Sequence, residues 1–263
     1  MPRTIIVPTL TEFWDRVRAV PVRFGSDTRP LEHWVTKDRA EATERRSWSS
    51  DAILRRFAAA LLERNVSGSN YQRRIAEFER SFGDPRVLGY PHALEMLKSS
   101  GYRYPQTGAE VLRQVVAKLT KPEFSWSAYF ARAEAEWESG FKEDDLICEI
   151  KGIGNKTRNF ALSEFSEYYC APDLHVMRIM ARSGLVLHKI GDPAFHTSDP
   201  LFVCKVINHL ARETGFPGQS DALSPAAIDR MFWYYGQDRS KCDVTPGCSE
   251  CPANDICLTG QNR

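Results

Sequence analysis

Four cysteines near the C-terminus are the residues in this sequence with the clearest chemical potential. They follow the spacing C-x5-C-x2-C-x5-C and comprise Cys242, Cys248, Cys251 and Cys257. Four thiolates this close in sequence can ligate one tetrahedral metal ion or one iron–sulfur cluster. Disulfides are not expected, because the N-terminus carries no apolar stretch typical of a secretory signal. On spacing alone, zinc and an iron–sulfur cluster fit equally well.

A second chemical feature is a glycine-containing turn between two predicted helices. Its sequence fits the pattern h-x-G-h-G and reads Ile150-Lys151-Gly152-Ile153-Gly154-Asn155-Lys156-Thr157. Gly152 and Gly154 permit tight or positive-φ conformations and let a phosphate approach main-chain N–H groups. The positive dipole end of the following helix favours such an anion. The pattern therefore indicates either a grip on a DNA backbone or an ordinary corner between two helices.

An Asp-x-His segment follows this turn, with Asp173 placed 17 residues after Lys156. The turn has the form G-h-G-x-K-T and the later segment the form D-x-H-h-h-R. Together they resemble the endonuclease III branch of the helix-hairpin-helix DNA glycosylases. The resemblance implies that Lys156 is the Schiff-base nucleophile and Asp173 the essential carboxylate. The hairpin residues expected to contact DNA are Gly152, Gly154, Asn155 and Thr157.

The chemistry that the resemblance implies begins with a nucleotide flipped out of the base stack, at a cost of roughly a few kcal/mol. Breaking the N-glycosidic bond builds positive charge on the sugar, which a carboxylate such as Asp173 stabilises. The Lys156 amine then attacks C1′ and forms a Schiff base, and β-elimination nicks the strand. Taken singly, a lysine at a helix start is usually a surface residue, and an aspartate after a proline is usually an N-cap. The interpretation depends on the hairpin, the lysine, the Asp-x-His segment and the four cysteines occurring together.

The resemblance also bears on the cysteines. Members of that branch hold a structural 4Fe–4S cluster in a C-terminal C-x6-C-x2-C-x5-C loop, and this sequence differs by one residue in the first gap. The resemblance thus favours a 4Fe–4S cluster over zinc for residues 242–257. The cluster is expected to support DNA binding rather than base chemistry. The three remaining cysteines, Cys148, Cys170 and Cys204, are expected to be small buried residues.

The N-terminal half matches the family less well. Asn65 stands where the family has a glutamine that fills the gap left by the flipped base. Tyr102, after Gly101, stands where an apolar wedge is expected, and an aromatic ring can intercalate. The alternative is that Asn65 and Tyr102 are ordinary loop or helix-end residues with no contact to DNA. A polar extension over residues 1–48 and Lys151 in place of the usual hairpin proline also depart from the family pattern.

The composition is that of an ordinary globular protein. Of 263 residues, 42% are hydrophobic and 26% charged, and the net charge is only +1. No apolar run approaches the roughly 18 residues needed to span a bilayer, so we expect a soluble protein that is cytoplasmic and nucleoid-associated or otherwise intracellular. Because the charge is nearly neutral, the case for DNA depends on the motifs. Most arginines of local basic clusters, including Arg45, Arg46, Arg55, Arg56 and Arg158, are expected on solvated helix surfaces.

Apolar residues recur with helical spacing almost throughout, which predicts an all-α fold. We expect two helical lobes, one over residues 50–165 with the hairpin, the other joining 1–49 to 166–263 with the cysteine loop. Helices are expected at 144–150, 156–169, 201–214 and 225–235, and one is expected to begin after an N-cap at Asp173. The segment 23–48 is expected to be a surface loop or an irregular cover.

These observations predict a bifunctional DNA glycosylase and AP lyase, expected to be monomeric, with damaged or abasic duplex DNA as its partner. Oxidised pyrimidines are the default lesion class by resemblance. One alternative is a monofunctional glycosylase, against which Lys156 argues. Another is a non-catalytic iron–sulfur DNA-binding protein, against which the pair of Lys156 and Asp173 argues.

Overall fold

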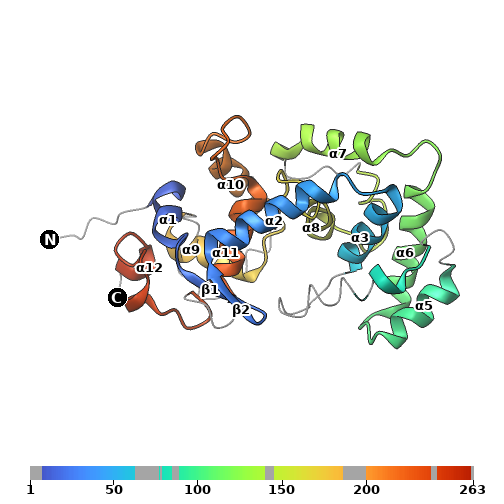
Figure 1. Cartoon of the computed structure of the whole chain (residues 1–263), viewed down its shortest axis with the longest axis horizontal. Helices are drawn as coiled ribbons and strands as arrows, with labels where there is room; N and C mark the ends of the chain where they lie inside the picture. Colours follow the sequence, from blue (N-terminus) through green and yellow to red (C-terminus); the bar gives the residue numbers. More distant parts are fainter. Residues whose placement is uncertain are drawn as a thin grey trace. The chain divides into compact units, whose positions relative to one another are not determined.

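The computed structural model describes residues 8–62, 77, 79–84, 89–139, 145–185, 200–237 and 242–261. Two compact units form: unit 1 comprises Met1–Ala40 with Cys170–Arg263, and unit 2 comprises Glu41–Tyr169. The described chain is helical apart from a two-stranded sheet (Figure 1), which confirms the predicted all-α class. None of the described helices is long and apolar enough to cross a membrane.

Unit 2 packs its helices around an aromatic-rich core. The helices are α3 (Ser50–Leu62), α5 (Tyr90–Ser99), α6 (Pro105–Leu119), α7 (Trp126–Ala135) and α8 (Asn155–Ser163), with the 3-10 turn η2 (Trp137–Ser139). α3 contacts both α6 and α8. Phe57 of α3 packs against Trp126 and Phe165, with ring centroids 5.2 and 6.3 Å apart. Because Ala161 and Leu162 of α8 are fully buried, this core fixes the helix that follows the glycine turn.

A buried ion-pair network ties the C-terminal end of α8 to the rest of unit 2. Glu164 is the C-cap of α8 and is only 1% exposed. Its Oε2 accepts hydrogen bonds from Arg56 Nε and Nη2 at 2.9 and 2.6 Å. The same oxygen lies 3.2 Å from Arg45 Nη1. The expectation of a solvated surface is therefore wrong for Arg45 and Arg56, which neutralise a buried carboxylate.

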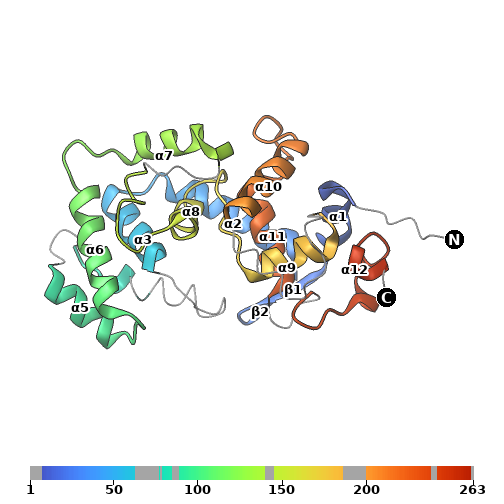
Figure 2. The ribbon, with the colours of Figure 1, turned by 180° about the vertical axis from the view of Figure 1, so that it is seen from behind.

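Unit 1 packs α11 against α9 and α10, and Figure 2 shows these helices from behind. Its elements are α1 (Leu10–Val17), β1 (Pro21–Phe24), β2 (Asp27–Pro30), most of α2 (Leu31–Arg45), α9 (Leu174–Ser183), α10 (Pro200–Glu213), α11 (Pro225–Gly236), η3 (Cys248–Glu250) and α12 (Leu258–Gln261). Gly236 ends α11 where α9 approaches it. A Cβ at this position would lie 2.8 Å from Ile179 Cδ1, so the absence of a side chain permits the contact.

The segment 23–48 is not the irregular loop or cover expected from the sequence. β1 and β2 pair antiparallel, with Phe24 opposite Asp27, and the helix α2 follows directly. The turn between the strands contains Gly25 with φ +62°, a conformation that glycine adopts readily. Trp34 Nε1 donates to Val22 O at 3.1 Å, and Phe24 lies edge-on to Tyr234 at 5.4 Å. Contacts with α11, far away in sequence, thus stabilise strands too short to be recognised locally.

Candidate active site and cysteine pocket

The glycine turn is held by two buried isoleucines. Ile153 N donates to Ile150 O at 3.0 Å, which closes a four-residue β-turn. Gly152 occupies the third position of this turn with φ +94°, the conformation for which glycine is suited. Ile150 and Ile153 are 0% and 6% exposed. Residues 146–150 form successive turns rather than the predicted short helix. The hairpin is therefore anchored from beneath, with the glycines on its outer side.

The first turn of α8 presents main-chain N–H groups that no side chain caps. Its N-cap is Gly154, and a Cβ built there would meet no atom within 4 Å. Lys156 is exposed and makes no ion pair with any residue that the structure describes, while Asn155 and Thr157 are half-buried. Uncapped N–H groups and the positive dipole end favour a phosphate at such a position. α8 ends at Ser163, six residues short of the predicted end.

Asp173 caps α9 with one of its two carboxylate oxygens. Oδ1 accepts the main-chain N–H groups of His175 at 2.8 Å and Val176 at 3.1 Å, which confirms the predicted N-cap. No residue in the described ranges donates a hydrogen bond to the other oxygen, Oδ2. Asp173 is half-buried, and the neighbouring Leu174 is 52% exposed. The cap thus fixes the carboxylate while leaving one oxygen available.

His175 joins α9 to the end of α11. Its Nδ1 lies 2.7 Å from Gly236 O, and Arg178 Nη1 donates to the same oxygen at 3.5 Å. These bonds satisfy a carbonyl at the C-terminal end of α11 that the helix itself leaves free. His175 therefore positions the helix that carries Asp173. Asp173 belongs to unit 1, whereas Lys156 belongs to unit 2.

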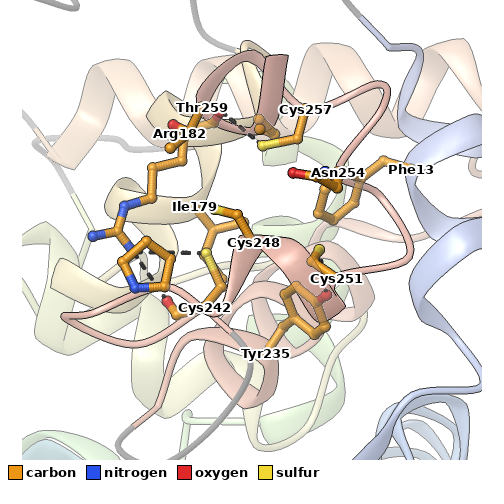
Figure 3. A pocket seen from close by; sticks show the side chains of 13 residues that line it. Phe13, Ile179, Arg182, Tyr235, Cys242, Cys248, Cys251, Asn254, Cys257 and Thr259 are labelled. Atoms are coloured by element: carbon orange, nitrogen blue, oxygen red, sulfur yellow. Dashed lines mark hydrogen bonds between the residues drawn. The ribbon is translucent and has the colours of Figure 1, made fainter. Parts of the chain in front are cut away.

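The four C-terminal cysteines line one pocket, with Phe13, Ile179 and Tyr235 among the other side chains around it (Figure 3). The pocket holds about 380 Å³ of empty space, part of it open to solvent. The loop that carries the cysteines turns tightly, because Cys251 N donates to Cys248 O and Cys257 N to Ala253 O. These turns bring all four cysteines, which are spaced along 16 residues of sequence, to the lining of one pocket.

Arg182 of α9 provides the main polar contacts of this loop. Its Nη1 donates to Asp243 O at 2.5 Å and lies 3.7 Å from Cys242 Sγ. In return, Cys257 Sγ donates to Arg182 O at 3.0 Å. Burial raises the pKa of the Cys242 thiol to about 11, although the guanidinium acts in the opposite direction. Tyr235 OH lies 3.1 Å from Cys251 Sγ, so a polar group also reaches a third thiol.

The thiols of this pocket do not form a metal-binding group as the described side chains lie. In the described part of the chain, no group of three or more His, Cys, Asp or Glu side chains is arranged to hold a metal ion. A single zinc ion needs every sulfur at about 2.3 Å from one centre. The pocket brings the four cysteines together without providing that arrangement.

Comparison with known proteins identifies the fold. No protein-family model matches the sequence, and no curated protein matches it. The 8-oxoguanine DNA glycosylase of Thermotoga maritima matches the structure with a TM-score of 0.57 at 23% identity, over 81% of this chain and 92% of that one. The chain has the helix-hairpin-helix DNA glycosylase fold.

Two further solved structures are similar to this chain. The Methanocaldococcus jannaschii 8-oxoguanine glycosylase/lyase, in complex with DNA containing 8-oxoguanine, matches with a TM-score of 0.52 at 16% identity, over 77% of this chain and 89% of that one. A trapped endonuclease III–DNA covalent intermediate matches with a TM-score of 0.48 at 18% identity, over 89% and 94%. The third likeness is too distant to add to the assignment, which depends on the first two.

Asn65 and Tyr102 are the two remaining residues predicted from the sequence to contact DNA. Asn65 lies outside the described residues. Tyr102 is 9% exposed, and its hydroxyl donates to Leu62 O at 2.8 Å. Gly108 leaves room for the Tyr102 ring, since a Cβ there would lie 2.8 Å from it. The wedge role of Tyr102 stays a prediction that requires the ring to leave this buried position.

A buried network lies directly beneath the hairpin and was not predicted from the sequence. Arg158, expected on a solvated surface, is 1% exposed and pairs with Asp145 at 2.7 Å. Tyr129 OH also donates to Asp145, at 3.2 Å. Burial, and then the charge of Asp145, raise the pKa of Tyr129 well above 10, so its hydroxyl stays protonated. The signal for burial was that Ala161 and Leu162, three and four residues later on the same helix face, are apolar, and nothing local identified the partner of Arg158.

Proposed function

We propose that the chain is a DNA base-excision repair glycosylase with AP lyase activity, acting on duplex DNA with a damaged base or an abasic site. The observation that carries the proposal is the exposed Lys156 amine in the uncapped first turn of α8, directly after the hairpin. A DNA phosphate bound at those N–H groups would bring a neighbouring sugar close to this amine. The glycosylase fold is consistent with that chemistry.

In the proposed reaction, the Lys156 nitrogen forms a bond to C1′ as the bond from C1′ to the base breaks. The base leaves with a proton, and opening of the sugar ring gives a Schiff base. Loss of a C2′ proton and cleavage of the C3′–O bond then nick the strand, and water releases the enzyme from the imine. Asp173 Oδ2, which the N-cap leaves available, stabilises the positive charge that develops on the sugar.

The hairpin supplies the grip on DNA in this proposal. Gly152 and Gly154 keep side chains away from the approaching phosphate, while Asn155 and Thr157 flank the N–H groups of the first turn. Such contacts position DNA without reading its sequence. A chain of net charge +1 depends on such local contacts, because it has no large basic excess to attract DNA.

We infer that Cys242, Cys248, Cys251 and Cys257 hold a 4Fe–4S cluster. The support is that all four cysteines line one pocket, and that their spacing differs by one residue from the cluster loop of the family that the sequence resembles. The Arg182 guanidinium beside Cys242 supplies positive charge next to ligating thiolates. When bound, the cluster would supply cross-links that order the C-terminal loop, and no step of base removal depends on it.

The substrate screen for this proposal covers two classes of lesion. Oxidised pyrimidines are implied by the endonuclease III resemblance. 8-Oxoguanine is the base named for the two solved structures that carry the fold assignment. Duplexes that contain either lesion should therefore be tested side by side with an abasic duplex, which requires only the lyase step.

Trapping with sodium borohydride tests the proposal. Wild-type protein incubated with an abasic duplex and the reductant should give a covalent complex that survives denaturing electrophoresis. Lys156→Gln should abolish the complex. Lys121→Gln, which removes another exposed lysine of unit 2, should leave it intact. Absence of a complex with wild-type protein that still binds DNA would reject the lyase and favour a monofunctional glycosylase or a non-catalytic binder.

A further inference from the structure

Asp145 ties together the first arm of the hairpin, the turns over residues 146–150. Its Oδ1 accepts Ile147 N at 2.8 Å, and its main-chain oxygen accepts Cys148 N at 2.9 Å. The carboxylate is nearly buried, with an exposed fraction of 8% for the whole residue. The Tyr129 hydroxyl of α7 also donates to this carboxylate, at 3.2 Å from Oδ1. Asp145 therefore fixes the approach of the chain to the glycine turn.

Arg158 joins the second arm, α8, to the same carboxylate. Nε and Nη2 both donate to Asp145 Oδ2, at 3.0 and 2.7 Å. Nη1 donates to Asn159 Oδ1 at 3.0 Å, and the guanidinium lies 4.9 Å from the centre of the Tyr169 ring. The planar guanidinium thus has partners along its edge and on its face. Its side chain is only 2% exposed.

Arg158 and Lys156 point to opposite sides of α8. Residues two apart on a helix are separated by roughly 200° around its axis. This accounts for an exposed Lys156 and a buried Arg158 within one turn. Any rotation of α8 that moved the lysine would have to break the two bonds by which Arg158 Nε and Nη2 converge on Asp145 Oδ2. Two donors of one rigid guanidinium on a single carboxylate oxygen restrain the direction of the contact as well as its distance.

We propose that the Arg158–Asp145 pair is a buried staple that closes the two arms of the hairpin and thereby positions the Lys156 amine and the N–H groups beside it. Arg158 and Asp145 are positioning residues, since neither reaches the surface that would meet DNA. Their catalytic consequence rests on the proposed function, whereas the closure of the hairpin does not. An apolar pair of similar volume would pack as well but would leave the rotation of α8 less defined.

The matched control is the second buried arginine that holds α8. Arg56 pairs with Glu164 at the C-terminal end of the same helix and is also buried. Arg158→Met leaves the buried Asp145 carboxylate without an arginine, and Arg56→Met leaves the buried Glu164 carboxylate with Arg45 alone, so both lower the stability of unit 2. Only Arg158→Met releases the hairpin. The two variants, compared at a temperature where circular dichroism shows both folded, separate positioning from general stability.

Amide hydrogen exchange and single-turnover trapping provide the test. In Arg158→Met, exchange over residues 146–157 should accelerate about tenfold or more, and the rate of borohydride-trapped complex formation at saturating abasic duplex should fall about tenfold to a hundredfold. Arg56→Met should leave both within about threefold. Arg158→Lys keeps the charge without the two guanidinium donors and should recover stability more fully than the rate.

Unchanged hairpin exchange in Arg158→Met, or equal effects in the two methionine variants, would overturn the staple. If wild-type protein forms no trapped complex, the proposed AP lyase activity is rejected. Two other measurements still test whether the Arg158–Asp145 pair closes the hairpin. These are the hydrogen exchange and the affinity for a duplex with a tetrahydrofuran abasic analogue, which should fall about tenfold in Arg158→Met only.

Discussion

Arg182 Nη1 lies 3.7 Å from Cys242 Sγ and donates to the carbonyl oxygens of both Cys242 and Asp243. One side chain of α9 therefore holds the start of the cysteine loop, on the helix that Asp173 caps. An arginine next to a ligating thiolate lowers the repulsion among thiolates and orders their main chain. The contact thus joins the proposed cluster site to the element that carries the carboxylate.

Arg182→Met should weaken retention of the proposed cluster. The variant loses the bonds to the loop and the positive charge near Cys242, so iron and sulfide should be lost to a chelator about tenfold faster than from wild type. Visible absorbance of the purified protein measures the loss. Arg16→Met is the control, because Arg16 also reaches the loop, through Asp255, but that pair is solvent-exposed. Equal retention in all three proteins would contradict the assigned role of Arg182.

Substitutions at Asp173 should separate its two roles. Asp173→Asn keeps an oxygen that can cap α9 and should leave stability near that of wild type, whereas Asp173→Ala should cost about 1 kcal/mol. Both variants should lose about a hundredfold or more in base excision, because each removes the negative charge. Thermal unfolding and single-turnover base release measure the two effects. Full activity in Asp173→Asn would exclude the carboxylate from the chemistry.

Gly154→Ala should impair DNA binding without unfolding the hairpin. Gly154 has φ −111°, which alanine adopts freely, and a Cβ there would meet no protein atom within 4 Å. The methyl group would instead occupy the space through which a phosphate reaches the N–H groups, and affinity for an abasic-analogue duplex should fall about tenfold.

Gly152→Ala provides the contrasting case for the hairpin. Its φ of +94° is unfavourable for alanine, so this variant should lose about 1 kcal/mol or more of stability. Fluorescence anisotropy and urea unfolding, measured on both variants, separate the two glycines. Wild-type affinity in Gly154→Ala would indicate that this turn does not contact the DNA backbone.

Local signals in the sequence predicted the parts of the site that local structure determines. Asp173 caps α9 because its side chain bonds N–H groups two and three residues ahead, a relationship that sequence displays directly. The glycine turn before Lys156 was visible for the same reason. α10 and α11 begin within one residue of their predicted starts, since their apolar spacing is regular.

Long-range partners account for what the sequence did not reveal. Arg56 is buried because it pairs with Glu164, which lies 108 residues later in the chain. No local sequence pattern distinguishes Arg56 from a surface arginine. The strand β1 depends on Phe24 packing against Tyr234 of α11. Its four residues bury only Val22 fully, too little for a recognisable alternation. Both cases require the tertiary structure.

The most direct test of the central claim locates the covalent bond itself. Borohydride-reduced complex with an abasic duplex should be digested with nuclease and protease and mapped by mass spectrometry. The reduced sugar adduct should be carried by the peptide containing Lys156, on the side chain of that residue. An adduct on another lysine or on the N-terminal amine, with Lys156 unmodified, would contradict the central claim.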